Sequence, residues 1–289
     1  MANLKEVRNR ISSVKSTQQI TKAMKMVSAA KLKRATDAVL TMQPFAEKLS
    51  EIIKNVSAGV DTSLNKFGES REVQKVLIIA LTSDKGLCGG FNSNITKKLV
   101  NSISENYSNV DVTVLPVGKK VADFVKREGI NFIPDFSEQL SDTSFTSISK
   151  VASYAMDAFL SGEYDQVDLV FNEFKNVATQ IVQSNTFLPL TLESEESASA
   201  EVDYIFEPNK EFILENLIPK ALKTEFYSAV LNSVAGEHGA RMTAMDKATD
   251  NAGELLKDLK LIYNRTRQAA ITTEILEIVG GAEALASGK

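Results

Sequence analysis

The stretch LKEVRNRISSV, residues 4–14, spaces its apolar side chains three, four and three residues apart, at Leu4, Val7, Ile11 and Val14. This is the spacing of a coiled-coil seam, although the regular pattern fades after Val14. No glycine precedes Gly59, and Pro44 is the only proline before it. We therefore expect one helix from Asn3 to Val56, roughly 80 Å long, which a compact domain of this size cannot bury.

The last part of the chain repeats this behaviour. No proline follows Pro219, so the pattern predicts a helix from Lys220 to Lys289, on the order of 100 Å long. Since one segment opens the chain and the other closes it, we expect an antiparallel pair in which the longer C-terminal helix projects beyond its partner. Apolar residues are expected to form its packing face: Leu255, Leu259, Ile262, Ala269, Leu276 and Val279.

Between these helices, apolar runs rich in β-branched residues alternate with helical patterns. The expected strands are 73–82, 110–117, 130–133 and 167–171, and the expected helices begin near Ser93, Lys119 and Ser144. Such alternation predicts βαβ crossovers and a mainly parallel sheet. Two extended runs follow, 180–190 and 202–206, separated by an acidic, serine-rich surface loop at 193–201.

The fold class is thus α/β, with a long antiparallel coiled coil of N- and C-terminal helices around a central α/β domain. We divide the chain into an N-terminal coiled-coil helix (1–60), the central domain (61–208) and a C-terminal coiled-coil helix (209–289).

Composition excludes several classes of protein. One cysteine, Cys88, rules out an internal disulfide, and one histidine, His238, makes a Cys/His zinc site untenable. An intracellular compartment fits this cysteine usage best. Neither a secretory signal nor a long uncharged apolar run is evident, so we expect membrane association only through partner subunits.

The N-terminal helix carries the positive charge of an otherwise acidic chain. Residues 1–34 contain nine Lys or Arg and one acid, Glu6, while the whole chain has a net charge of −4. A solvated face, a nucleic-acid patch, a targeting peptide and a docking surface for an acidic partner all fit such a run. No aromatic residue precedes Phe45, which disfavours nucleic acid, and Asn3 and Glu6 are placed like a capping pair, which disfavours a transit peptide.

A glycine-rich turn, Ser83–Asn92, follows the first strand. Its glycines, at 86, 89 and 90, fit neither GxGxxG nor GxxxxGK[ST], so we favour a tight packing turn over a phosphate cradle. We interpret Cys88 as a packed thiol and His238 as a packing or helix-surface residue. We assign no catalytic, cofactor-binding or metal-binding residue.

Three stretches together resemble the gamma subunit of bacterial F-type ATP synthases, and the resemblance runs from end to end. They are residues 4–35 (LKEVRNRISSVKSTQQITKAMKMVSAAKLKRA), 83–95 (SDKGLCGGFNSNI) and 240–285, which includes ARMTAMDKATDNA and YNRTRQAAITTEILEIVGGAEAL. The segment from Ile271 to Ala284 resembles the signature of that family.

The resemblance implies a rotor shaft without a catalytic site or cofactor of its own. Its coiled coil would turn inside a ring of three alpha and three beta subunits. The middle domain would be Rossmann-like and form the foot, with the epsilon subunit beside it and the membrane c-ring below. Proton flow would drive the rotation and so ATP synthesis on the beta subunits, at the cytoplasmic face of the bacterial inner membrane.

The resemblance also implies which residues contact the beta subunits. Met24, Arg267, Gln268 and Thr272 match shaft residues that face beta-subunit loops, and Lys22, Lys25 and Arg265 are weaker candidates for acidic contacts. Two departures limit this carry-over. Lys85 stands where the family commonly has arginine, and the insertion and second cysteine of the redox-regulated chloroplast form are absent.

Two alternatives remain open at this point. A structural coiled-coil tether with an α/β head would share the architecture, although a tether should keep strict heptads along both helices. A nucleotide-binding enzyme with helical arms would rest on the turn at 86–90 alone.

Overall fold

The computed structural model describes residues 4–57, 66–69, 71–177, 179–190 and 210–288. Two long helices, α1 (Leu4–Ser57) and α5 (Lys210–Ser287), run through two compact units. We call Met1–Val27 with Met242–Lys289 the coiled-coil unit, and Ser28–Arg241 the domain unit. The two long helices are confirmed, while the division at residues 60 and 208 stays a prediction.

A four-stranded sheet lies at the centre of the domain unit. Its strands are β1 (Lys75–Leu81), β2 (Asp111–Val117), β3 (Gln166–Phe174) and β4 (Gln180–Leu188), in the order β2-β1-β3-β4. β1 pairs in parallel with β2 and β3, whereas β4 is antiparallel to β3. The expected mainly parallel sheet is therefore confirmed.

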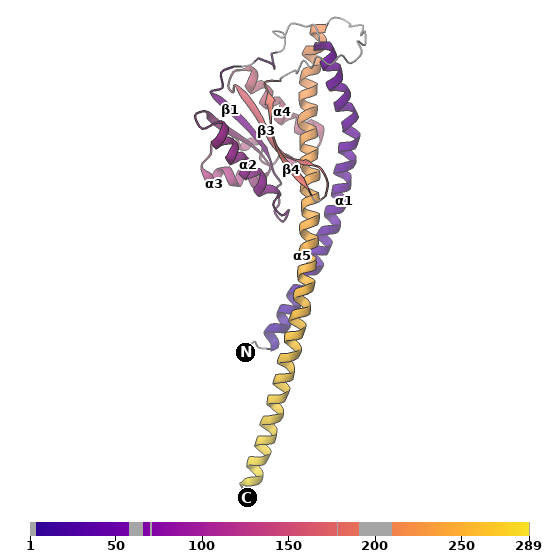
Figure 1. The fold of residues 1–289 in the computed structure, drawn as a ribbon, viewed down its shortest axis with the longest axis vertical. Coiled ribbons are helices and arrows are strands. Elements are labelled where there is room, and N and C mark those ends of the chain that lie inside the picture. The colour runs from indigo at the N-terminus through magenta and orange to yellow at the C-terminus, as the bar shows by residue number, and fades with distance from the viewer. Residues whose placement is uncertain (1–3, 58–65, 70, 178, 191–209, 289) are drawn as a thin grey trace. The chain divides into compact units, whose positions relative to one another are not determined.

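Helices cover both faces of this sheet (Figure 1). Alternate residues of β1, such as Ile78, pack under α2 (Phe91–Asn106) and α3 (Lys119–Glu128). The residues between them, such as Ile79, pack under α4 (Phe145–Leu160) and α5. Burial on both faces explains why β1 is an unbroken apolar run instead of an alternating one.

Two predicted boundaries have clear local causes. The Ser144 hydroxyl accepts a hydrogen bond from the Ser147 amide at 3.3 Å, which caps the start of α4. α3 ends where Gly129 adopts φ 70°, a conformation that glycine reaches without a steric penalty. Short 3₁₀ turns, η2 (Pro134–Phe136) and η3 (Gln139–Ser141), connect α3 to α4.

Two expectations for the middle of the chain need comment. The strand expected at 130–133 is reduced to a single parallel bridge between Val114 and Phe132. The chain there turns at once into η2, so no ladder forms. The extended run at 202–206 and the acidic loop at 193–201 lie outside the described residues.

The predicted start of α5 at Lys220 is wrong, since the helix begins at Lys210 and contains Pro219. A proline inside a helix costs about 3 kcal/mol because it lacks an N–H and crowds the preceding turn. Leu214, Ile218 and Leu222 are buried around it in the domain core. Burial of three such side chains, at about 1.5–3 kcal/mol each, outweighs that cost.

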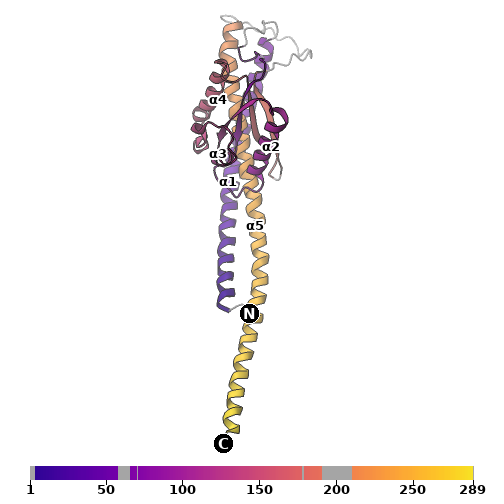
Figure 2. The same ribbon diagram turned by 90° about the vertical axis from the view of Figure 1, so that its left-hand side faces the viewer.

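The coiled-coil unit is an antiparallel pair. Gln18, Thr21 and Lys25 bond to Thr249 and Asp246, so the numbering rises on one helix as it falls on the other. In both views of the unit, the yellow end of α5 runs on past the N-terminal end of α1 (Figures 1 and 2). The projecting C-terminal helix is confirmed.

The seam of α1 does not fade after Val14 as expected. Buried or half-buried residues continue at alternating spacings of four and three through Gln18, Thr21, Lys25 and Ser28, and on to Ile53. The pattern was hidden because these four seam positions hold polar residues. Regular heptads therefore give no ground for rejecting a tether.

The predicted packing face of α5 is also largely wrong. Leu259 is buried, but Leu255, Ile262, Leu276 and Val279 are 39–65% exposed. Ala269 is exposed as well. The actual seam positions repeat at spacings of four and three and include small and polar side chains: Met245, Thr249, Ala252, Leu256, Leu259, Tyr263, Thr266 and Ala270. Apolar size alone therefore pointed to the wrong face.

Candidate partner-binding surfaces

The polar part of the seam joins the two helices of the coiled-coil unit through side chains. The hydroxyls of Thr21 and Thr249 lie 2.8 Å apart, and the Gln18 amide donates to the Thr249 carbonyl at 3.4 Å. One turn further along α1, the Lys25 ammonium lies 2.5 Å from the Asp246 carboxylate. These contacts fix which residues face each other across the seam.

The predicted contact residues lie at two levels of this unit. Met24 is half-buried and Lys22 is exposed, beside the pair of Lys25 with Asp246. The other group, Arg265 to Thr272, lies on α5 about 20 residues beyond Asp246, or roughly 30 Å along the helix. The structure therefore provides two candidate contact levels instead of one cluster.

At the level beyond Asp246, the side chains point to solvent. Arg265, Arg267, Gln268 and Thr272 are all exposed. Among the described residues, Arg267 and the Gln268 amide have no hydrogen-bond or ion-pair partner, while the Thr272 hydroxyl donates to the Gln268 carbonyl at 2.9 Å within the helix. This surface is available to another chain.

The distal part of α5 is an exposed apolar surface. Every residue from 271 to 283 is exposed. The large side chains among them include Ile275 at 54%, Leu276 at 65% and Ile278 at 71% exposure. Soluble monomers rarely expose contiguous apolar surface of this kind, which marks it as an interaction surface. Sequence reasoning placed Leu276 and Val279 on the packing face and so missed part of this surface.

In the domain unit, Arg241 holds the glycine-rich turn against α5. Its guanidinium donates to the carbonyls of Lys85 at 2.9 Å and Gly86 at 3.3 Å. It also lies 2.5 Å from the Glu237 carboxylate, and both side chains are at most 15% exposed. Residue 85 contributes its backbone here, so the exchange of arginine for lysine at this position leaves the contact intact.

The turn is also closed from within. The Asn92 side chain accepts from the Ser83 amide at 3.0 Å and donates to the Cys88 sulfur at 3.2 Å. Cys88 is 2% exposed, and its packing confirms the interpretation as a buried thiol. The turn presents two carbonyl oxygens to Arg241, so on this side it serves as a packing contact with α5.

His238 lies one turn before Arg241. Burial, together with the positive charges of Arg241 and Lys31, lowers its pKa to about 4. The imidazole is therefore neutral at pH 7, as expected for a packing residue. No group of three His, Cys, Asp or Glu side chains that could hold a metal occurs in the described ranges.

A sequence profile described as ATP synthase matches residues 3–285. The ATP synthase gamma chain of Flavobacterium johnsoniae is 55% identical, and that of Cytophaga hutchinsonii is 53% identical. Each match covers 99% of both chains. The chain belongs to the ATP synthase gamma-chain family. It is a non-catalytic subunit of the complex and forms its central stalk.

Solved structures support the same fold. A chain from the central stalk and c-ring of the Tetrahymena thermophila mitochondrial enzyme is 26% identical, with a TM-score of 0.56 and coverage of 79% of this chain and 99% of that one. A rotor chain from the Euglena gracilis mitochondrial enzyme is 22% identical, with a TM-score of 0.63 and coverage of 93% and 98%. Within the described parts of the gamma chain, no helix has the length and hydropathy that a bilayer crossing requires.

Proposed function

We propose that the coiled-coil unit turns inside a ring of three alpha and three beta subunits and couples ion-driven rotation to ATP synthesis. The observation that carries this proposal is the distal part of α5, whose residues 271–283 are all exposed and include large apolar side chains. A surface of this kind suits a bearing with few strong fixed contacts. An asymmetric shaft contacts chemically identical beta subunits differently and so biases their nucleotide affinities.

The partners follow from this arrangement. We propose that the epsilon subunit packs beside the domain unit, that a membrane c-ring lies below it, and that protons drive the ring. We place the chain at the cytoplasmic face of the bacterial inner membrane, where it is attached only through the other subunits of the complex. The exposed lysines and arginines of α1 suit an acidic surround. Lys22 and Arg265 are the better placed cations, because Lys25 is already paired with Asp246.

Isolation of the chain from membranes tests the assembly. Co-purification of nucleotide-binding alpha and beta chains in a 3:3:1 complex is the expected result. A homodimer without these chains would instead support the structural tether with an α/β head.

The contact residues are tested separately. We propose that Met24, Arg267, Gln268 and Thr272 contact the beta subunits. Arg267→Ala with Gln268→Ala should lower coupled ATPase activity several-fold in the reconstituted complex, while the free chain keeps its circular dichroism spectrum and unfolding midpoint. These side chains have no partner among the described residues, so their loss removes no intrachain bond.

A matched control replaces two other consecutive exposed residues of α5, Lys257→Ala with Asp258→Ala. It should leave coupling near the wild-type value. Wild-type coupling in the Arg267 and Gln268 variant would refute these contacts without affecting the assignment of the chain to the stalk.

A further inference from the structure

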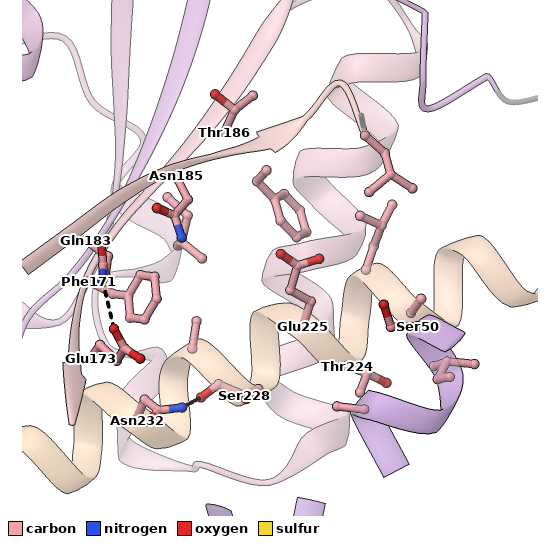
Figure 3. Close-up of a pocket in the computed structure, with 18 of the residues that line it drawn as sticks. Ser50, Phe171, Glu173, Gln183, Asn185, Thr186, Thr224, Glu225, Ser228 and Asn232 are labelled. Atoms are coloured by element: carbon pink, nitrogen blue, oxygen red, sulfur yellow. Dashed lines mark hydrogen bonds between the residues drawn. The ribbon is translucent and has the colours of Figure 1, made fainter. Parts of the chain in front are cut away.

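A pocket of about 570 Å³ lies within the domain unit, between the sheet and the two long helices (Figure 3). Strands β3 and β4 form one wall, and residues of α1 and α5 form the other. Ligand sites for small molecules have volumes of about 300–1,000 Å³. The pocket is therefore large enough for a small organic molecule, and its lining includes none of the residues proposed to contact the beta subunits.

Its walls combine polar side chains with a group of large apolar ones. Phe171 and Phe187 line it from the sheet, Leu49 and Ile53 from α1, and Leu222 from α5. Aromatic rings and branched aliphatic side chains favour an apolar ligand body. A bare inorganic ion would leave these walls without a contact.

Two carboxylates give the pocket its charge, and they differ in their partners. Glu173 of β3 accepts a hydrogen bond from the Gln183 amide at 2.8 Å. Glu225 of α5 has no hydrogen-bond or ion-pair partner among the described residues, and Figure 3 shows its carboxylate pointing into the space below β4. Asn185 of β4 points into the same space. Among the residues whose side chains the structure describes, no lysine or arginine lines the pocket.

The surroundings of Glu225 disfavour the ionised form of its carboxyl group. Its side chain is exposed, and partial desolvation by neighbouring protein atoms raises the pKa of the carboxyl. A carboxylate without a partner is stabilised most by a cation that also donates hydrogen bonds. Among the described lining residues, an anionic ligand would meet two carboxylates and no basic side chain.

We propose that this pocket binds a small organic cation, with an ammonium group on the Glu225 carboxylate and an apolar stem between the sheet and the long helices. The ammonium donates to Glu225 and to the Asn185 side-chain oxygen. The stem packs against Phe171 and Phe187. Such a ligand ties β3 and β4 to α1 and α5, and it is independent of the nucleotide chemistry of the complex.

The test uses 2-phenylethylammonium as the probe and titrates it into the full 289-residue chain by calorimetry and saturation-transfer NMR. The uncharged 2-phenylethanol and the anionic 3-phenylpropionate are the matched probes. The cation should bind at least fivefold more tightly than the alcohol, and the anion should not bind. Equal affinity for cation and alcohol would overturn the proposal.

Substitutions locate the site. Glu225→Gln should reduce affinity for the cation to that for the alcohol, whereas Glu215→Gln, an exposed residue of α5 outside the pocket, should leave it unchanged. A second variant, Ala46→Leu, narrows the pocket from α1 without touching its charge and should weaken both probes. If Glu225→Gln and Ala46→Leu both bind the cation as the wild type does, the cation binds elsewhere and the proposal fails.

Discussion

The Arg241 guanidinium fixes the glycine-rich turn to α5 through hydrogen bonds to two of its carbonyls. The turn was predicted from its glycines, but its docking on α5 depends on bonds from Arg241 to carbonyls about 155 residues earlier in the chain. Neither the turn nor the helix carries a local signal for this contact. Replacement of Arg241 by an uncharged residue would also leave the Glu237 carboxylate largely buried without its ion-pair partner, which destabilises the fold.

His238 gives a direct test of how closed this region is. It is the only histidine in the chain, so its imidazole yields a single NMR titration, which we expect near the pKa of about 4. An unfolded histidine titrates near 6.5, so as the pH falls from about 6.5 to 4 the unfolded state takes up the proton first. Stability should therefore be lost over that window.

The magnitude follows from the same linkage. Between pH 7 and pH 5, the wild type should lose about 1–2 kcal/mol more unfolding free energy than His238→Gln, as measured by urea denaturation. The raised pKa of Glu237 acts in the opposite direction, and comparison of the two proteins cancels it because both retain Glu237. A titration near 6.5 would show that His238 is solvated in the folded chain.

At the scale of elements, the seam of the two long helices is regular in its spacing even where its residues are polar. Thr21 is 8% exposed and Ser28 is 3% exposed, so these positions are enclosed as fully as the apolar positions of the same helix. The hydroxyls of Thr21 and Thr249 each also lie within hydrogen-bond distance of a carbonyl of their own helix. Each hydroxyl has one proton, so one of the two donates across the seam while the other donates to its own helix, and this bond helps to set the register.

A double-mutant cycle on Thr21 and Thr249 measures this contact. Thr21→Val alone should weaken the local stability of α1 by about 0.5–1.5 kcal/mol, as read from hydrogen exchange of nearby amides. Thr21→Val with Thr249→Val replaces both partners by groups of the same shape and should recover most of that loss. Additive losses would mean that the two hydroxyls do not interact across the seam.

Sequence reasoning succeeded where a local signal matched the packing and failed where distant residues decided. The end of α1, the strands β1 to β3 and the cap at Ser144 all follow from local patterns. The start of α5 was missed because burial of Leu214 and Ile218 carries the helix through Pro219. The pocket around Glu225 was missed because it is assembled from four elements far apart in the chain.

At the scale of the whole molecule, residues 272–283 are all exposed, so this segment adds little to the stability of the fold. Removal of residues 272–289 should change the unfolding free energy of the remainder by less than about 0.5 kcal/mol, because the side chains from 272 to 283 are exposed. Urea denaturation followed by circular dichroism checks this. A shift of several kilocalories per mole would show that this segment packs on the rest of the chain.

The exposed apolar end of α5 also bears on the life of the chain before assembly. A newly made copy exposes Ile275, Leu276 and Ile278 to water. Two copies that meet can bury these side chains against each other, which is more favourable than leaving them in water. Self-association grows with concentration, whereas capture by the proposed ring of alpha and beta subunits removes one copy at a time. A cell that makes this protein therefore has to keep its synthesis in step with that of the chains that enclose it, because any surplus is a source of aggregates.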